Sequence, residues 1–395
     1  MVLRQRNFGF VWSSMTVAAM GSQMEGVVLG WYVLTLTDSP FLVGLIAAAR
    51  MGLNFLAIFA GAVADRVSRQ RLLAGVELIM TCLAVLMLVL IISERLEVWH
   101  IFALTLAGGL VRMFQMPAAQ SLVADTLTSD RISNGVALTT MGRNFATIVG
   151  PLVGGFLFQI SGPQGAYSAI ALLYCLSGVA ALLITTPRNG APRKEESVLS
   201  AVGQGLKYVK SEQVLWATLL LAVIINLTGW PLHTSLMPVF ARDVLGTGSA
   251  GLGILMSAFG IGAIVGSVSL AMVQNLNRPG KFLIASVVAW HGSMLLFAAS
   301  TTFPLSLGIL MLTGMAFSAT QVLMTTVLLR TALPEFRGRV MGLRVQAIYA
   351  YTFGSLNSGF VAGVWGAPWA ANINAVVGIG LVSILAFFTP KLRRA

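Results

Sequence analysis

Long apolar segments recur along the whole chain, and they leave very few folds open to it. A helix needs about 20 mostly apolar residues to cross the hydrocarbon core of a bilayer. The sequence predicts twelve such spans, at approximately 8–36, 40–64, 72–92, 98–119, 141–160, 165–186, 214–240, 250–272, 282–300, 304–328, 342–364 and 368–388. Backbone polar groups inside a bilayer must be satisfied within helices or closed barrels. The pattern therefore predicts an all-α integral membrane protein.

The composition excludes most soluble classes of protein. Hydrophobic residues make up 57% of the chain and charged residues only 10%, against roughly 25% charged residues in an ordinary soluble domain. Cys82 and Cys175 both lie inside apolar segments, which excludes a disulfide framework or a zinc site, so we expect no metal and no cofactor. The net charge of +12 would suggest nucleic acid in a soluble protein. Here the cations lie in short loops between apolar segments, and we expect no nucleic-acid partner.

The positions of the cations predict the topology. Of the 25 lysines and arginines, 19 fall on one side of the twelve-span scheme, two (Arg95 and Arg242) on the other, and four within spans. The positive-inside rule then places both termini in the cytoplasm. We expect an N-terminal six-helix bundle at 1–186, a cytoplasmic linker at 187–213 and a C-terminal six-helix bundle at 214–395.

The linker carries an apolar stripe at helical spacing. Its members are Val198, Val202, Leu206 and Val209. The spacing predicts a short amphipathic helix on the inner membrane surface, with a flexible linker as the alternative.

The two predicted bundles are weakly repeated. The segment GLIAAARMGL at Gly44 aligns with GILMSAFGIG at Gly253, an offset of 209 residues. Further on, SDRISNGVAL at Ser129 resembles PEFRGRVMGL at Pro334, an offset of 205. Parallel repeats around a site at the bilayer midplane are a transporter architecture.

The loop after the second span reads GAVADRVSRQR. Gly61 permits close approach of a neighbouring helix, and Asp65 is placed to pair with an arginine or to accept hydrogen bonds from a helix terminus. Arg66, Arg69 and Arg71 are placed to contact lipid headgroups or carboxylates at an inner gate. A plain positively charged inner loop is the simpler interpretation, but the spacing is more specific than that.

This loop resembles motif A of the major facilitator superfamily, with Ser68 where glycine is usual. The resemblance implies that Asp65, Arg66 and Arg69 act as an inner gate and conformational switch.

Two further segments resemble the same superfamily. In span four, Arg112 and Gln115 lie three residues apart, on one face of a helix, and they resemble motif B, whose arginine is associated with proton coupling. In span five, GPLVGG resembles motif C, which is typical of the exporters of the superfamily and implies antiport. Its residues of interest are Gly150, Pro151, Gly154 and Gly155. Kinked, closely packed helices are also common in membrane bundles without such a role.

The segments FQMPAAQSLVADTLTSDRISNGVAL and PEFRGRVMGL resemble the branch that contains the enterobactin exporter and the macrolide-efflux proteins, which are drug:proton antiporters. The resemblance covers essentially the whole chain. It implies the major facilitator fold, with two pseudo-symmetric six-helix bundles and a cavity lined by spans one, four, seven and ten.

Charged residues within the spans are candidates for function, because each costs roughly 2.5–3.5 kcal/mol at the centre of a helix. Glu25 is the one deep acid, and Arg50 lies at a similar depth. We expect a Glu25–Arg50 ion pair, a proton-carrying Glu25, or both. Glu77 is expected to snorkel inward or to pair with a gate arginine, and Arg112 has no evident acidic partner. The cationic interior predicts a neutral or anionic cargo.

Polar residues at helical spacing mark further candidate cavity faces. Asn226, Trp230 and His233 share a face of span seven, and Gln321 belongs to a similar face of span ten. Hydrogen bonding between helices is the alternative; we favour the cavity for Asn226 and Gln321. Arg344, in the first turns of span eleven, is expected to snorkel.

We therefore expect a secondary active transporter and not an enzyme: a proton-coupled exporter of a small amphiphilic neutral or anionic compound, drug-like or siderophore-like, working by alternating access. An importer or lipid flippase on the same scaffold is the alternative. A membrane-embedded transferase is less favoured, because the three histidines are scattered and no predicted outer loop is long enough to form a catalytic domain. No Walker A motif is present, so we do not expect ATP to be the direct energy source. We expect a small-molecule substrate, protons as coupling ion, contacts with membrane lipids, a monomer, and a location in the cell (inner or plasma) membrane.

Overall fold

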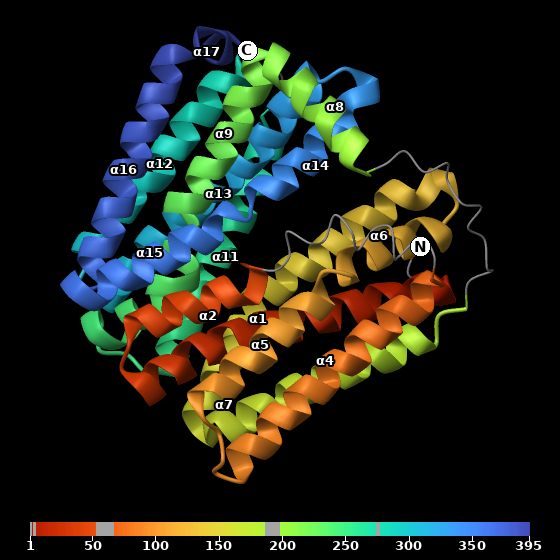
Figure 1. The fold of residues 1–395 in the computed structure, drawn as a ribbon, viewed down its shortest axis with the longest axis vertical. Coiled ribbons are helices and arrows are strands. Elements are labelled where there is room, and N and C mark those ends of the chain that lie inside the picture. The colour runs from red at the N-terminus through yellow and green to blue at the C-terminus, as the bar shows by residue number, and fades with distance from the viewer. Residues whose placement is uncertain (1, 3–4, 53–66, 186–197, 274–276) are drawn as a thin grey trace. The chain divides into compact units, whose positions relative to one another are not determined.

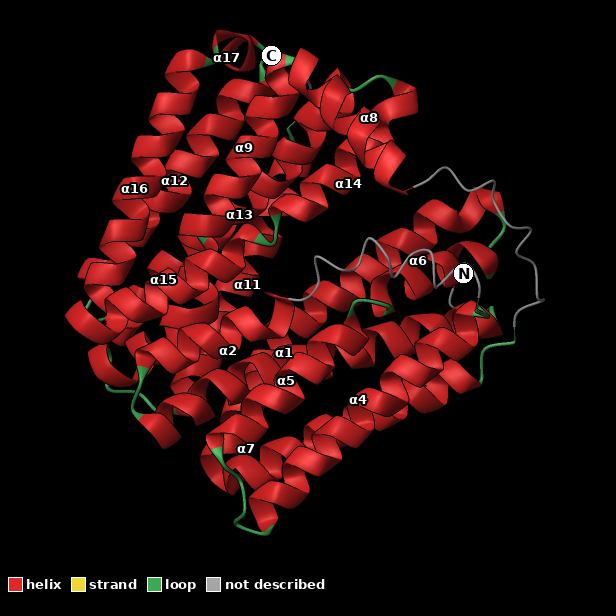
Figure 2. Cartoon of the chain, in the orientation of Figure 1, coloured by secondary structure: helices red, strands yellow, loops and turns green. Residues whose placement is uncertain are grey.

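The computed structural model describes residues 2, 5–52, 67–185, 198–273 and 277–395. All regular secondary structure in these ranges is helical, which confirms the all-α prediction (Figures 1 and 2). The elements are α1 (Arg6–Thr37), α2 (Pro40–Gly52), α4 (Arg69–Ile92), α5 (Val98–Arg112), α6 (Gln115–Asp125), η3 (Ser129–Arg131), α7 (Ile132–Leu182), α8 (Val198–Ser211), α9 (Gln213–Thr228), η4 (Leu232–Leu236), α10 (Met237–Val239), η5 (Phe240–Val244), α11 (Ser249–Ala271), α12 (Pro279–Ala299), α13 (Phe303–Thr331), η6 (Pro334–Phe336), α14 (Arg337–Ala347), α15 (Ala350–Trp365), α16 (Ala367–Phe388) and α17 (Pro390–Arg394).

Eight helices in the described ranges are long and apolar enough to cross a bilayer. The predicted count of twelve is not reached by that measure, for identifiable reasons. Predicted spans five and six both lie in α7, whose 51 residues turn at Gly162 with φ 63°, a backbone conformation that favours glycine. Helix α2 ends its described part at Gly52, and the rest of predicted span two lies outside the described residues. Twelve spans remain a prediction.

Two predicted spans are interrupted where polar or aromatic residues gather. Span four divides into α5 and α6, so that Arg112 ends one helix and Gln115 begins the next. The two residues between them, Met113 and Phe114, keep helical backbone angles, and the prediction that Arg112 and Gln115 share one helix face stays a prediction. In span seven, α9 ends at Thr228, and π-helical turns follow in η4 and η5. Pro231 lies at the first of these turns and cannot donate a backbone hydrogen bond.

The chain forms two compact units. Unit 1 comprises Met1–Thr37, Ala49–Lys194 and Gly248–Ile254, and unit 2 comprises Asp38–Ala48, Glu195–Thr247 and Leu255–Ala395. Each unit therefore contains most of one predicted bundle and one short segment from the other. The short segments are the first part of α2 and the first turns of α11.

Unit 1 is built on α7, which packs along both α1 and α4. An apolar core joins these helices to α6 at one end, where Phe8, Leu73 and Leu122 are fully buried. Small residues bring the backbones together: a Cβ atom on Gly154 would lie 3.2 Å from Cα of Met24 on α1. Close packing of this kind replaces the hydrophobic driving force that is missing between helices in lipid.

Unit 2 is built on α12, which packs against α13 and α16, while α15 packs against α16 and α9. Its largest buried side chains include Trp290, Tyr351 and Phe297. The predicted linker helix is present as α8. It is fixed to the segment before α14 because Tyr208 stacks on Phe336 with ring centroids 4.2 Å apart and accepts a hydrogen bond from the amide of Leu333 at 3.0 Å.

Candidate functional site

An ion cluster around Glu25 lies inside unit 1. Glu25 is on α1, and its Oε2 atom lies 2.5 Å from Nη2 of Arg112 at the end of α5. The hydroxyl of Tyr174 on α7 donates to the same oxygen at 2.9 Å. Arg112 also donates to the hydroxyl of Ser22, one turn before Glu25. Three helices thus converge on one carboxylate.

Arg50 is the second cation of this cluster. Its Nη2 atom lies 3.7 Å from Oε2 of Glu25 and donates to the backbone carbonyl of Ser22 at 2.9 Å. The predicted Glu25–Arg50 pair is therefore present, but Arg112 is the closer partner, so the expectation that Arg112 lacks an acid is wrong. The side chains of Glu25, Arg112 and Arg50 are only 14%, 18% and 23% exposed. Two guanidinium groups share one carboxylate, which leaves the cluster with a surplus positive charge.

A second buried carboxylate lies next to the break between α5 and α6. Glu77 on α4 is fully buried, and Gln115 donates to its Oε1 atom at 2.6 Å. Its Oε2 atom has no hydrogen-bond partner among the described residues. The expectation that Glu77 snorkels is therefore wrong, because α6 covers it with Gln115. The break places Arg112 on one carboxylate and Gln115 on the other.

The carboxylates within the predicted spans all belong to the first half of the sequence. The six predicted spans from residue 214 to the end contain no aspartate or glutamate.

Tyr174 and Glu77 are the functional candidates that the sequence analysis did not select. Tyr174 gave no signal because its hydroxyl is the one polar atom of a side chain in an apolar run.

Unit 2 carries an aromatic group at the kink of span seven. Trp230 stacks on Phe317 of α13 with centroids 5.0 Å apart, and His233 lies 4.3 Å from Phe259 of α11 by the same measure. Trp290 closes the group with an edge-to-face contact to Phe317 at 5.2 Å. The Nδ1 atom of His233 is enclosed and has no hydrogen-bond partner among the described residues. The rings pack against one another around the kink, and in the part of the chain that the structure describes the one polar atom they enclose without a partner is this Nδ1.

Gln321 belongs to a second polar network of unit 2. Its Oε1 atom accepts a hydrogen bond from Arg344 of α14 at 2.8 Å, and Arg344 also donates to Thr325 at 2.7 Å. Arg344 is thus held by α13, which corrects the prediction that it snorkels. Asn226 is 9% exposed and donates to the carbonyl of Ala222 in its own helix at 2.8 Å. That bond connects no second helix.

The glycines of the motif C segment pack against two different neighbours. A Cβ atom on Gly150 would lie 2.7 Å from Cβ of Gln23 on α1, so this face and that of Gly154 are pressed against α1. A Cβ atom on Gly155 would instead collide with the backbone of Ser249 in the first turns of α11, which belong to the same unit. Pro151 lies between these contacts and is buried.

Part of the gate motif lies within the described residues. Arg69 is the first residue of α4, and its Nη1 atom donates to both carboxylate oxygens of Asp125 at the end of α6, each at 2.7 Å. Arg71 is exposed two residues later. The predictions for Gly61, Asp65 and Arg66 fall outside the described residues. Asp125 is a partner that the sequence analysis missed, since nothing in its spacing links it to Arg69.

Known proteins similar to this chain are membrane transporters. A family model described as transmembrane secretion effector, of the major facilitator type, matches residues 2–395. The multidrug efflux pump Tap of Mycolicibacterium fortuitum is 23% identical over 95% of this chain and 94% of its own length. The staphyloferrin A transporter of Staphylococcus aureus is 21% identical, covering 97% and 96%. Macrolide efflux protein A of Streptococcus pyogenes is 17% identical, covering 71% and 70%.

Solved structures share the fold. A bacterial homologue of the human lysosomal transporter Spinster, in an inward-facing and unoccupied conformation, superposes with a TM-score of 0.75 at 15% identity, over 98% of each chain. The nucleoside transporter NupG reaches a TM-score of 0.73 at 14% identity, over 98% of this chain and 99% of that one. At these identities the likeness concerns the fold.

Proposed function

Because this chain belongs to the major facilitator family of transmembrane secretion effectors, we propose that it is a proton-coupled exporter of a small, amphiphilic, neutral or anionic compound. The chain is a multi-pass membrane transporter of small molecules, and its efflux relatives favour export of drug-like or siderophore-like cargo. The observation that carries the proton-coupled part is the Glu25 cluster, in which one buried carboxylate holds two arginines and a tyrosine.

Glu25 is the group that we assign to carrying the proton. Burial disfavours its charged form and the two guanidinium groups favour it, so movement of either arginine changes whether the carboxylate holds a proton. If the ion pair is loose in one state of the transport cycle and tight in the other, Glu25 binds and releases one proton in each transport cycle. Arg112, as the closer partner at 2.5 Å, is the residue whose displacement has the larger effect.

The sign of the coupling depends on the charge of the cargo. A neutral cargo that donates a hydrogen bond to ionised Glu25 competes with the proton, and competition for one group produces exchange. An anionic cargo that binds Arg112 instead draws that arginine away from Glu25 and favours protonation, so cargo and proton bind together. Antiport therefore favours a neutral cargo within the proposed range.

The aromatic group of unit 2 is assigned to the apolar part of the cargo. Trp230 and Phe317 offer stacked rings, and the unpaired Nδ1 of His233 offers one directional contact. Gln321 and Asn226 remain proposed members of the pathway. The remaining proposals are a gate at the loop from Gly61 to Arg71, alternating exposure of the site through two six-helix halves, cytoplasmic termini, a cell-membrane location and a monomeric state.

Everted membrane vesicles test the proposal directly. With an acid interior they should accumulate a neutral fluorescent amphiphile such as Nile red, and the accumulation should collapse when nigericin dissipates the pH gradient. Glu25→Gln should abolish the response to the gradient, while Glu335→Gln, a change of an exposed acid outside the spans, should leave it intact. Accumulation that ignores the gradient would refute proton coupling.

Import is the competing function on the same scaffold. It predicts that only right-side-out vesicles accumulate the probe. Parallel assays with 1-anilinonaphthalene-8-sulfonate (anionic) and rhodamine 6G (cationic) then establish the charge class. Faster transport of the cationic probe than of the other two would contradict the inference drawn from the surplus positive charge.

A further inference from the structure

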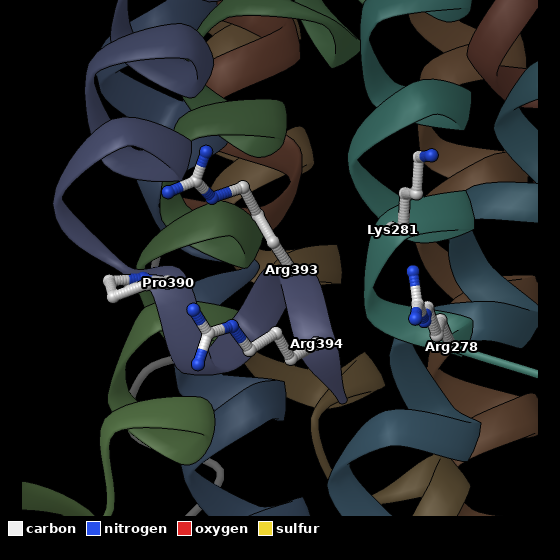
Figure 3. Close-up of a pocket in the computed structure, with 5 residues that line it drawn as sticks. All are labelled: Arg278, Lys281, Pro390, Arg393 and Arg394. Atoms are coloured by element: carbon white, nitrogen blue, oxygen red, sulfur yellow. The ribbon is translucent and has the colours of Figure 1, made fainter.

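A basic pocket lies in unit 2 where α12 begins and α17 ends (Figure 3). Its volume is about 350 Å³. Arg393 and Arg394 line it from α17, across from Arg278 and Lys281 at the start of α12 (Figure 3). Four cationic residues, two from α17 and two from the start of α12, therefore line one pocket.

The backbone under these cations is held in place. Leu392 is fully buried, and a Cβ atom on Gly280 would collide with its carbonyl oxygen, so only glycine allows α17 to come this close to α12. The amide of Gly280 donates to an oxygen of Ala395 at 3.1 Å, and the amide of Lys391 donates to Oε1 of Gln213 at 3.0 Å. The arrangement of the four cations is thus a product of the fold.

The pocket is strongly basic. Among the described residues, no aspartate or glutamate side chain lies within the 4.0 Å of an ion pair from any of its four cations. The four positive charges repel one another, and a bound anion would reduce this electrostatic repulsion. The planar fork of arginine matches the oxygens of a phosphate group, and three of the four cations are arginines.

The neighbouring surface is apolar and exposed. Phe282 directly follows Lys281 and is 50% exposed, and Phe387 and Phe388 end α16 just before the pocket with 72% and 68% exposure. In a helix long and apolar enough to span a bilayer, such side chains face lipid. Acyl chains thus have a surface beside the cavity in which a headgroup would lie.

We propose that this pocket binds a phosphate group, presented by an anionic phospholipid of the surrounding membrane. The arginines hold the phosphate oxygens, and the acyl chains lie against the exposed phenylalanines. Free inorganic phosphate is the other source of the same chemistry, and the experiment separates the two. The proposal needs only that the chain lies in a membrane; it does not depend on proton coupling or on the direction of transport.

The test uses the full-length protein in a neutral detergent and follows its thermal stability as dioctanoyl phosphatidylglycerol is added. Dioctanoyl phosphatidylcholine and inorganic phosphate are titrated in parallel. Each cation near a lipid surface contributes about a fivefold change in affinity, so the double variant R393Q/R394Q should raise the midpoint of the phosphatidylglycerol titration about 25-fold. The matched control K207Q/K210Q removes two exposed cations of α8 and should change it less than twofold.

The outcomes are distinct. Stabilisation by phosphatidylglycerol alone, lost in R393Q/R394Q and kept in the control, supports the lipid site. The same loss, with inorganic phosphate reproducing the stabilisation, supports the pocket and identifies free phosphate as its occupant. Equal losses in both double variants, or no loss in R393Q/R394Q, overturn the proposal. Should that variant fail to fold, Lys281→Gln provides the test, with an expected change of about fivefold.

Discussion

Replacing Glu25 by glutamine removes the carboxylate that two arginines share, and the cost can be worked out from the structure. Its Oε2 atom lies 2.5 Å from Arg112 and 3.7 Å from Arg50. At an effective dielectric constant of about 20, the gross attraction is about 6–7 kcal/mol for the first pair and about 4–5 kcal/mol for the second. Desolvation offsets much of this, and loss of one partner of a buried pair typically costs about 3–5 kcal/mol.

We therefore expect Glu25→Gln and Arg112→Gln each to lower the free energy of unfolding by about 3 kcal/mol, the lower end of that range, because the two side chains are 14% and 18% exposed. The double variant should lose about 3–4 kcal/mol, not the sum of the single losses, which gives a coupling energy of about 2–3 kcal/mol. Arg50→Gln should cost less than Arg112→Gln, since its contact is longer.

The assay is unfolding by sodium dodecyl sulfate in mixed micelles, followed by tryptophan fluorescence, for the wild type and each variant. The cycle between Glu25 and Arg50 is the internal comparison and should give the smaller coupling. If Glu25 and Arg112 are additive within about 0.5 kcal/mol, or if Arg50 is the more strongly coupled arginine, the assignment of Arg112 as the principal partner is refuted.

Three other changes have outcomes that the structure sets. Gln115→Leu removes the 2.6 Å hydrogen bond to the buried carboxylate of Glu77 and should lower the free energy of unfolding by about 1–3 kcal/mol in the same titration. Gly155→Val forces a side chain into the backbone of α11 and should abolish the monodisperse peak in size-exclusion chromatography, whereas Gly75→Ala, which meets open space, should not. Arg69→Gln breaks a pair whose side chains are 30% exposed; stability should change by less than about 1 kcal/mol while vesicle transport slows, and a loss above about 2 kcal/mol would show a structural role instead.

The sequence was sufficient for the class of fold, because hydropathy acts locally and each long apolar segment carries its own signal. It also predicted the linker helix, whose stripe from Val198 to Val209 recurs at helical spacing, and α8 spans Val198–Ser211. The count of spans was harder. The turn at Gly162, with φ 63°, falls in the gap that the sequence analysis left between predicted spans five and six, where the chain reads SGPQ, yet the helical hydrogen bonding of α7 runs through it, so that one element holds two predicted spans.

The partners of the charged groups were not predictable from spacing. Arg112 lies at the end of α5 and meets Glu25 of α1 at 2.5 Å, a contact between residues 87 positions apart that spacing along one helix does not indicate. Glu77 was expected to snorkel inward or to pair with a gate arginine, and it is instead buried, with Gln115 at the start of α6 donating to it. Such pairings depend on where a helix breaks, which hydropathy does not record.

The confinement of every in-span carboxylate to the first half of the sequence has an evolutionary consequence if the proposed roles hold. Energy conversion is then encoded before the linker, and the aromatic surface at Trp230 and Phe317 is encoded after it. Selection for a new compound can act on the later codons without disturbing the earlier ones. Chimaeras that join the first half of this chain to the second half of a relative should inherit the chemical repertoire of the relative and the energetics of the parent.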